Sequence, residues 1–342
     1  VPTNRSMSGR LTSPNVDGVL REVLRWVGVP IAWAALWLLQ RSNRKIGLAL
    51  AYHGVREHPL PAGTVLLPDH DTGVFARQAR YLGRHYRIVA ASQLREAIGC
   101  RKRGDRFPLA ITFDDDLPSH RLTSLPVLQR LGLTATFFVC GASLSEPFSF
   151  WWERLDRATA HDVDVAAEIP FLRAKLPRTR LPATKTTIQQ IGEFIKALPL
   201  AERDEIADQL GSAVGPDPAG AGMRASDIRV LRDAGFEIGF HTLRHAFLPA
   251  LDDESLRDAM TEGRERLSAI TGGPLTTISY PHGGVDDRVA AAAREAGFRY
   301  GFTMEADAIT PADDSLRIGR IVPSFDSTGH LAARLVHALA TS

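Results

Sequence analysis

The stretch Leu109-Ala-Ile-Thr-Phe-Asp-Asp-Asp116 is the most informative part of this chain. An apolar and β-branched run that ends in three carboxylates predicts a buried strand with its charges at the C-terminal edge of a sheet. Parallel α/β sheets carry their chemistry at that edge. Adjacent carboxylates repel one another, so we expect either a bound cation or side chains that diverge into water. A solvated acidic turn is the alternative interpretation.

Two histidines follow a second short apolar stretch. Glu237-Ile-Gly-Phe240 predicts another strand, which ends in His241, and His245 comes four residues later. Two neutral imidazoles and one carboxylate form a facial set of ligands that suits Zn²⁺ or a similar divalent ion and leaves positions open for water and substrate. The sequence therefore predicts a metal site at the strand ends. The alternative is a buried core histidine followed by a helix-capping one.

A third strand end carries a sharp turn. Thr276-Thr-Ile-Ser-Tyr280 is followed by Pro281-His282-Gly283-Gly284. The proline forces the chain to turn, and the glycines allow backbone N–H groups to approach a ligand closely. Such an N–H group could donate to an oxyanion. An ordinary strand-to-helix turn is the alternative.

These motifs together resemble those of the polysaccharide deacetylase family, the NodB-homology domain of carbohydrate esterase family four. The resemblance rests on Ile111 to Asp115, on His241-Thr-x-x-His245 and on Tyr280-Pro-His-Gly283, which occur in the order of the family. Ala51-Tyr-His-Gly54 is similar to the opening of the branch that deacetylates poly-N-acetylglucosamine. The resemblance extends over about residues 47–335.

The resemblance implies a role for each motif residue. Asp114 would be the general base that activates a metal-bound water, because a free carboxylate beside a positive centre can accept a proton. The metal, expected to be Zn²⁺, would be held by three ligands, Asp115, His241 and His245. The oxyanion would bind the metal and the backbone N–H of His282. Tyr280 and Pro281 would contact the substrate.

The general acid is the least defined member of the site. In the family it is a histidine of a late Leu-x-His motif, and the one match here, Leu335-Val-His337, lies in a helical pattern. We favour His53 as the acid because it also follows an apolar strand; a core histidine is the alternative. Arg320 could orient Asp114 through a bidentate pair, with an exposed strand arginine as the alternative. Asp116 stands where the first family motif continues with glycine.

Strand and helix signals alternate along most of the chain, which predicts parallel strands. We expect an incomplete (β/α)7 barrel of the polysaccharide deacetylase type, formed by residues 46–140 and 225–342, with residues 252–271 as one helix. A helical insertion over residues 141–224 is predicted after the strand Thr134–Cys140, because this interval is too long for a plain loop. Near its start, Trp151 and Trp152 would form a sugar-stacking wall beside the pocket. The alternative is that they only seat the insertion on the barrel.

Residues 1–45 are expected to hold a tail and an apolar helix. The stretch from Trp26 to Leu39 has fourteen apolar residues with basic flanks, which is short of the ~20 needed to span a bilayer. Tryptophans and basic flanks are typical of helices in a membrane interface; a helix that covers one end of the barrel is the alternative. No cleavable signal peptide is evident. A membrane-associated or cell-envelope location therefore stays open.

Composition and missing motifs exclude several classes of protein. The formal net charge of +2 is spread without long basic runs, so no nucleic-acid partner is expected. The two cysteines, Cys100 and Cys140, provide no disulfide framework. Serine hydrolases, nucleotide enzymes and classical zinc proteases are excluded because Gly-x-Ser-x-Gly, a Gly-rich phosphate loop and His-Glu-x-x-His are absent.

The expected function is metal-dependent hydrolysis of N-acetyl groups on an amino-sugar glycan or glycoconjugate, with release of acetate. The expected partner is an N-acetylated sugar substrate. Two alternatives stay open: a non-catalytic glycan-binding relic of the same fold, and an amidase that acts on a small non-sugar amide.

Overall fold

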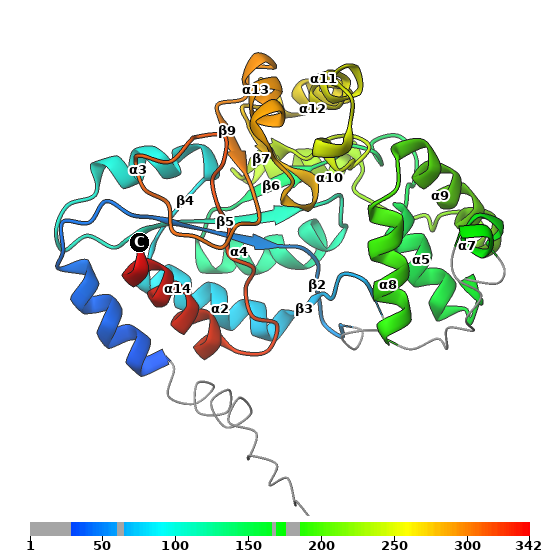
Figure 1. Ribbon diagram of the computed structural model, residues 1–342. Coiled ribbons are helices and arrows are strands. Elements are labelled where there is room, and N and C mark those ends of the chain that lie inside the picture. The colour runs from blue at the N-terminus through cyan, green and yellow to red at the C-terminus, as the bar shows by residue number, and fades with distance from the viewer. Residues whose placement is uncertain (1–28, 60–64, 166–168, 176–184) are drawn as a thin grey trace, which may run out of the picture.

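The computed structural model describes residues 29–59, 65–165, 169–175 and 185–342 (Figure 1). Its centre is a seven-stranded sheet in which all paired strands are parallel. The strands are β1 (Leu48–Tyr52), β4 (Arg87–Val89), β5 (Pro108–Asp114), β6 (Thr136–Val139), β7 (Glu237–Phe240), β8 (Thr277–Ser279) and β9 (Tyr300–Phe302). β5 is central, because it pairs with β1 along one edge and with β4 and then β6 along the other.

The burial of the strands explains why their sequences are continuously apolar. Every residue of β1 and of β5 is buried, as expected for a parallel sheet that is covered on both faces. The acidic end of β5 is buried with the rest of the strand. The alternative of a solvated acidic turn is therefore wrong.

A short segment closes the gap between the two outer strands of the sheet. Ile318 forms a parallel bridge to Phe302 in β9, and Ile321 forms one to Leu50 in β1. Backbone hydrogen bonds accompany both bridges, for example from the Ala51 N–H to the Ile321 carbonyl oxygen over 3.1 Å. The sheet is thereby curled into the incomplete barrel that the sequence predicts.

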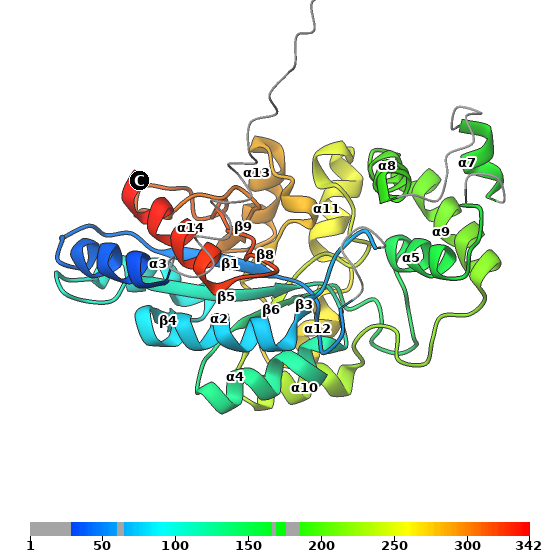
Figure 2. The ribbon, with the colours of Figure 1, turned by 90° about the horizontal axis from the view of Figure 1, so that it is seen from below.

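Helices surround the sheet (Figures 1 and 2). They are α2 (Thr72–His85), α3 (Leu94–Cys100), α4 (Leu125–Leu131), α10 (Ala225–Asp233), α11 (Asp253–Thr261), α12 (Arg264–Thr271), α13 (Asp287–Glu295) and α14 (Thr328–Thr341). The expectation of a single helix over residues 252–271 is wrong. Gly263 has a φ of 77° and separates α11 from α12, because a left-handed residue cannot continue a right-handed helix.

In the described part of residues 141–224, four helices pack around an apolar cluster of their own. They are α5 (Trp151–Ala160), α7 (Pro170–Lys175), α8 (Lys185–Lys196) and α9 (Leu200–Val214). Their shared core includes Leu155, Ile195 and Ile206, all fully buried. They lie beside the end of the barrel at which β1 is followed by the short pair β2 (Val55–Arg56) and β3 (His70–Asp71) (Figure 1).

Asp156 of α5 provides a test of how the insertion is attached to the barrel. Its Oδ1 accepts a hydrogen bond from the Leu66 N–H over 2.9 Å. Burial, which outweighs the nearby charge of Arg56, raises the pKa of Asp156 to about 7. The protonated carboxyl is therefore favoured in the folded state. The protonated Asp156 carboxyl contributes its full stabilisation below the pKa that it has in the unfolded chain, which is ~4. This stabilisation is lost as the pH rises through about 7.

We expect Asp156→Asn to stabilise the protein at pH 8 but not at pH 4, because the amide keeps the acceptor oxygen and cannot ionise. The stability gained has an upper limit of about 4 kcal/mol. Urea unfolding of the wild type and the variant at both pH values measures it. A difference in unfolding free energy that is the same at pH 4 and pH 8 would contradict this account.

A helix over residues 29–40 precedes β1. Ala32 and Leu36 join the main core, with 3% and 1% of their surface exposed. The first three residues of the predicted stretch from Trp26 to Leu39, and the predicted tail before it, lie outside the described residues. Within the described ranges, no helix is both long and apolar enough to cross a membrane.

Candidate active site

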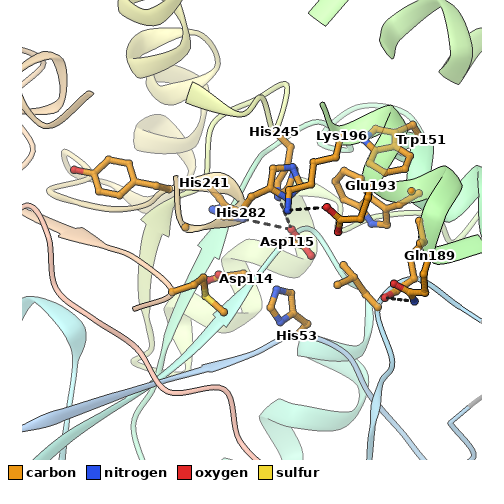
Figure 3. Close-up of a pocket in the computed structure, with 17 residues that line it drawn as sticks. His53, Asp114, Asp115, Trp151, Gln189, Glu193, Lys196, His241, His245 and His282 are labelled. Carbon is orange, nitrogen blue, oxygen red and sulfur yellow. Dashed lines mark hydrogen bonds and ion pairs between the residues drawn. The ribbon is translucent and has the colours of Figure 1, made fainter. Parts of the chain in front are cut away.

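Parallel strands bring the predicted site residues to one edge of the sheet. Asp114 is the last residue of β5, His241 directly follows β7, and Pro281 follows β8 after one residue. Because parallel strands end at the same edge, these residues converge. Asp114 and His241 line one cavity together with His53, which follows β1, and His282, which follows Pro281 (Figure 3).

Unusual backbone conformations are concentrated at this edge. Of the five non-glycine residues with a positive φ in the described part of the chain, four belong to the site: Asp115, Thr242, His245 and His282. Each costs on the order of 1–3 kcal/mol and persists only where the surrounding structure imposes it. The φ of 75° at Asp115 ends the strand geometry of β5, so the three carboxylates of the triplet leave the chain in different directions.

Asp115, His241 and His245 form a candidate metal centre. Oδ1 of Asp115 lies 3.5 Å from Nε2 of His241 and 3.4 Å from Nε2 of His245. This oxygen is buried and has no hydrogen-bond partner among the described residues. Ligand atoms about 2.1 Å from a tetrahedral Zn²⁺ would be about 3.4 Å apart. The donor set and its spacing therefore fit a divalent ion.

The protonation of the two histidines also suits a metal. Nδ1–H of His241 donates to the Ser279 carbonyl oxygen over 2.7 Å, which leaves the lone pair of Nε2 directed at Asp115. Burial lowers the pKa of His241, but Asp114 and Asp115 raise it by more, so the pKa lies above its usual value. Burial lowers the pKa of His245 to about 4. The neutral imidazole that a metal requires is thus the stable form of His245 at pH 7.

Asp114 is held by an arginine from the segment that closes the barrel. The two Nη atoms of Arg320 each donate to one carboxylate oxygen of Asp114 over 2.7 Å. The Ser279 hydroxyl donates to Oδ2 over 3.1 Å. Burial would raise the pKa of Asp114, but the charge of the fully buried Arg320 lowers it to about 2. The bidentate pair considered from the sequence is present, and Asp114 is ionised at neutral pH.

His53 and His282 face the same cavity as Asp114 and Asp115 (Figure 3). The ring of His282 meets that of His245 edge to face, with 4.7 Å between their centroids, and burial lowers the pKa of His282 to about 2. The turn at His282 is closed by N–H groups of Gly283 and Gly284, which donate to the carbonyl oxygens of Tyr280 and Pro281. The N–H of His282 takes no part in closing this turn. His337, the alternative acid, lies exposed on α14.

Tyr280 and Pro281 were expected to contact substrate. Tyr280 borders the cavity, but its side chain is fully buried and its hydroxyl donates to the Leu316 carbonyl oxygen over 2.9 Å. Its hydroxyl is therefore not directed at a ligand, and the main contribution of its side chain is packing. Pro281 is also buried and fixes the turn that carries His282.

Asp116 points away from the metal centre. Its Oδ1 accepts hydrogen bonds from the N–H groups of Cys140 and Gly141 over 2.7 and 3.1 Å, and its Oδ2 accepts one from Ala142 over 2.9 Å. These residues follow β6 directly and lead into the insertion. The third carboxylate of the triplet thus joins the end of β5 to the start of the insertion, and this is the structural use of the residue that replaces the family glycine.

We expect Asp116→Gly to destabilise the protein by about 2–4 kcal/mol, because two buried N–H groups and one partly buried N–H group lose their acceptor. Metal affinity and kcat should stay within a few-fold of the wild type, since neither Asp116 oxygen faces the cavity. Asp116→Asn keeps one acceptor oxygen, so its stability should lie between that of the wild type and that of Asp116→Gly. Denaturant unfolding, metal titration and turnover measure these quantities. Unchanged stability with a large rise in kcat would show instead that Asp116 obstructs the site.

The cavity has a volume of about 310 Å³ and an aromatic wall, a size typical of small-molecule sites. The Trp152 ring centroid lies 4.5 Å from that of His245, and Trp152 stacks on Phe150 at the same distance. Trp151 borders the cavity as well, and its Nε1 is buried with no hydrogen-bond partner among the described residues. The two tryptophans are 7% and 5% exposed. They therefore both seat the insertion and wall the cavity.

Helix α8 adds three polar residues that the sequence interpretation missed. Gln189, Glu193 and Lys196 border the cavity from the side opposite Asp114 (Figure 3). The Lys196 Nζ lies 3.7 Å from Glu193 Oε2, on the part of the cavity next to His282. Helical periodicity predicts this helix, but the sequence carries no signal for which of its faces meets the barrel.

A family model described as polysaccharide deacetylase matches residues 186–301. This range runs from α8 to β9 and contains two of the three motifs, those of His241 and of Pro281. It leaves out β5, so the assignment of Asp114 and Asp115 rests on their geometry.

Short segments of the chain match curated deacetylases. The poly-beta-1,6-N-acetyl-D-glucosamine N-deacetylase of Staphylococcus aureus is 40% identical over 58 residues, which is 17% of this chain and 20% of that protein. The enzyme of the same name from Staphylococcus epidermidis is 40% identical over 50 residues, which is 15% of this chain and 17% of that protein. The chain thus aligns with about a fifth of the length of these relatives or less.

Solved structures are similar over most of the chain. The deacetylase PplD of Streptococcus pyogenes gives a TM-score of 0.57 at 13% identity and covers 86% of this chain and 98% of its own. IcaB from Ammonifex degensii gives a TM-score of 0.54 at 16% identity and covers 84% of this chain and 97% of its own. Identities this low establish the fold alone. The family match over residues 186–301 and the motifs at the strand ends together support the polysaccharide deacetylase family, and the solved structures share its fold.

Proposed function

We propose that this protein is a metal-dependent hydrolase that removes N-acetyl groups from an amino-sugar glycan or glycoconjugate and releases acetate. The observation that carries the proposal is the position of Asp114. It is ionised, fixed by Arg320, and next in sequence to Asp115 of the candidate metal centre. A carboxylate base beside a divalent-ion site is an arrangement that can hydrolyse an unactivated amide. The matching segment of the curated poly-beta-1,6-N-acetyl-D-glucosamine N-deacetylases supports the substrate class.

A divalent ion held by Asp115, His241 and His245, with Zn²⁺ as the expected ion, would lower the pKa of water and polarise the acetamide carbonyl. Asp114 would accept a proton from the attacking water through one of its Oδ atoms. Arg320 keeps that carboxylate in one orientation, and the N–H of His282 would donate to the developing oxyanion. The C–N bond then breaks, and His53 would protonate the departing amine. The products are acetate and a free amino sugar.

The acid role of His53 has a direct test. His53→Ala should lower kcat by about 10²- to 10⁴-fold, the usual contribution of a general acid, while the metal content is retained. His337→Ala, a change on the exposed face of α14, is the matched control and should turn over normally. If His53→Ala keeps its kcat within a few-fold of the wild type, another group protonates the amine.

The substrate class is tested by acetate release from N-acetylglucosamine oligomers, with and without a chelator. Release that the chelator stops and Zn²⁺ restores is the expected result. Oligomer binding without acetate release would favour a glycan-binding relic. Faster release from a small non-sugar acetamide than from any oligomer would favour an amidase. Either outcome would replace the proposed function.

A further inference from the structure

The helix over residues 29–40 presents an unusual apolar face to solvent. Four of the eight large apolar side chains that are exposed in the described part of the chain lie on it: Ile31 (63%), Trp33 (52%), Trp37 (43%) and Leu38 (63%). Single exposed apolar residues are normal on a soluble protein, but a concentration of this kind marks an interaction surface.

This face is held rigidly on the barrel. On the inner side of the helix, Leu36 is packed into the main core. At the C-terminal end of the helix, the guanidinium group of Arg101 donates to the carbonyl oxygens of Gln40, Ser42 and Arg44 over 2.9, 3.1 and 2.6 Å. The bond to Gln40 satisfies an acceptor that the helix end leaves free, and the other two hold the segment that follows the helix. The outer face therefore cannot rotate inward to bury its tryptophans against the barrel.

The chemistry of the face matches a lipid surface. Indole rings concentrate at the boundary between acyl chains and headgroups, and neighbouring basic side chains are attracted by anionic lipids. The guanidinium carbon of Arg41 lies 3.4 Å from the ring centroid of Trp37, and both Arg41 and Lys45 are exposed directly after the helix. Apolar and positive groups are thus presented together.

The size of the face argues against a second copy of this chain as the occupant. The twelve described residues of the helix extend over about 18 Å. A face of that length and roughly 10 Å in width has an area of ~200 Å². Each partner in a stable dimer buries about 800 Å². A membrane interface imposes no such minimum, because apolar side chains and basic groups contribute individually.

The helix also fixes which way the catalytic cavity would face. It leads into the N-terminal end of β1, whereas the cavity lies at the C-terminal ends of the strands. In Figures 1 and 2 the helix and the α8 to α9 region lie at opposite ends of the molecule. A bilayer in contact with the helix would therefore leave the cavity open to the aqueous side.

We propose that the helix over residues 29–40 docks this protein on the surface of an anionic phospholipid bilayer, with Trp33 and Trp37 in the interface and the catalytic cavity facing away from the lipid. This inference does not depend on the proposed deacetylation. Its failure would leave the catalytic assignment unchanged.

The test is flotation of the full chain with vesicles of phosphatidylcholine alone or mixed with phosphatidylglycerol. We expect binding to the mixed vesicles, and at least about tenfold weaker binding for Trp33→Ser/Trp37→Ser and for Arg41→Glu/Lys45→Glu. Leu122→Ser, which removes an isolated leucine that is 59% exposed, is the matched control and should bind normally. Acetate release in solution should be equal in all four proteins.

Two further readouts locate the contact. Brominated lipids should quench tryptophan emission of the wild type much more than that of Trp33→Ser/Trp37→Ser, and alkaline carbonate should release the bound protein. The proposal is overturned if the wild type fails to float or if the tryptophan variant floats equally well. Resistance to carbonate would mean insertion rather than surface docking. A wild-type dimer that Trp33→Ser/Trp37→Ser dissociates would assign the face to a second copy instead.

Discussion

Asp114→Asn is expected to lower kcat for acetate release by about 10²- to 10⁴-fold. Asparagine retains the shape of the side chain but cannot accept a proton from water. The metal content should stay at the wild-type level, because Asp114 is not one of the three candidate ligands. Turnover and metal content measured on the same preparation separate loss of the base from loss of the metal.

Loss of stability must be separated from loss of catalysis in this variant. Removing the charge of Asp114 leaves the buried guanidinium of Arg320 without its counter-ion, which typically costs about 3–5 kcal/mol. Asp114→Asn/Arg320→Met removes both charges, so it should recover part of the unfolding free energy and none of the activity. Normal turnover by Asp114→Asn, or recovery of activity in the double variant, would contradict the assignment of the base.

His241→Ala is expected to abolish both metal binding and turnover. Removing a residue that hydrogen-bonds a metal ligand typically weakens metal binding by about 10- to 100-fold. Removing the ligand itself should weaken metal binding further. His241 also donates to the Ser279 carbonyl oxygen, so its loss loosens the end of β8. Isothermal titration with Zn²⁺ and an acetate assay measure the two effects.

His337→Ala is the control for His241→Ala, because His337 is an exposed histidine away from the cavity. It should bind metal and turn over normally. One equivalent of tightly bound Zn²⁺ in His241→Ala would remove this residue from the metal centre. Loss of turnover with metal retained would indicate a role in proton transfer rather than in coordination.

The convergence of the site was predictable because strand ends are visible in the sequence. Apolar runs that stop at Asp114, at His241 and before Pro281 place all three at one edge once the strands are parallel. Arg320 could be suspected as the partner of Asp114, from a position 206 residues away. Its bonds to Asp114 depend on the path of the segment that bridges β9 and β1, which has no signature in the sequence.

The direction of each carboxylate in the triplet was not predictable. Strand alternation would place Asp114 and Asp116 on one side, but the left-handed φ of Asp115 changes the path of the chain. Asp116 therefore meets the backbone of Cys140 to Ala142 and not the metal centre. A turn of this kind in a residue other than glycine has no clear signature in a single sequence.

The helices of the insertion were predictable from the sequence, but the residues that they contribute to the cavity were not. Its helices follow from apolar periodicity, and the break before α9 follows from Pro199. Which face of α8 meets the barrel depends on tertiary packing, so the contribution of Glu193 and Lys196 to the cavity could not be anticipated. By contrast, the break at Gly263 was foreseeable, because an isolated glycine is a common helix terminator.

The most direct test of the catalytic centre is acetate release measured against bound Zn²⁺ per chain, for the wild type and Asp114→Asn side by side. In the wild type, acetate and free amine should appear in equal amounts from N-acetylglucosamine oligomers. The rate should rise linearly to one equivalent of metal and then level off. Asp114→Asn should take up the same equivalent and stay near background. A wild-type rate that is independent of bound metal, or an Asp114→Asn protein as active as the wild type, would contradict the account.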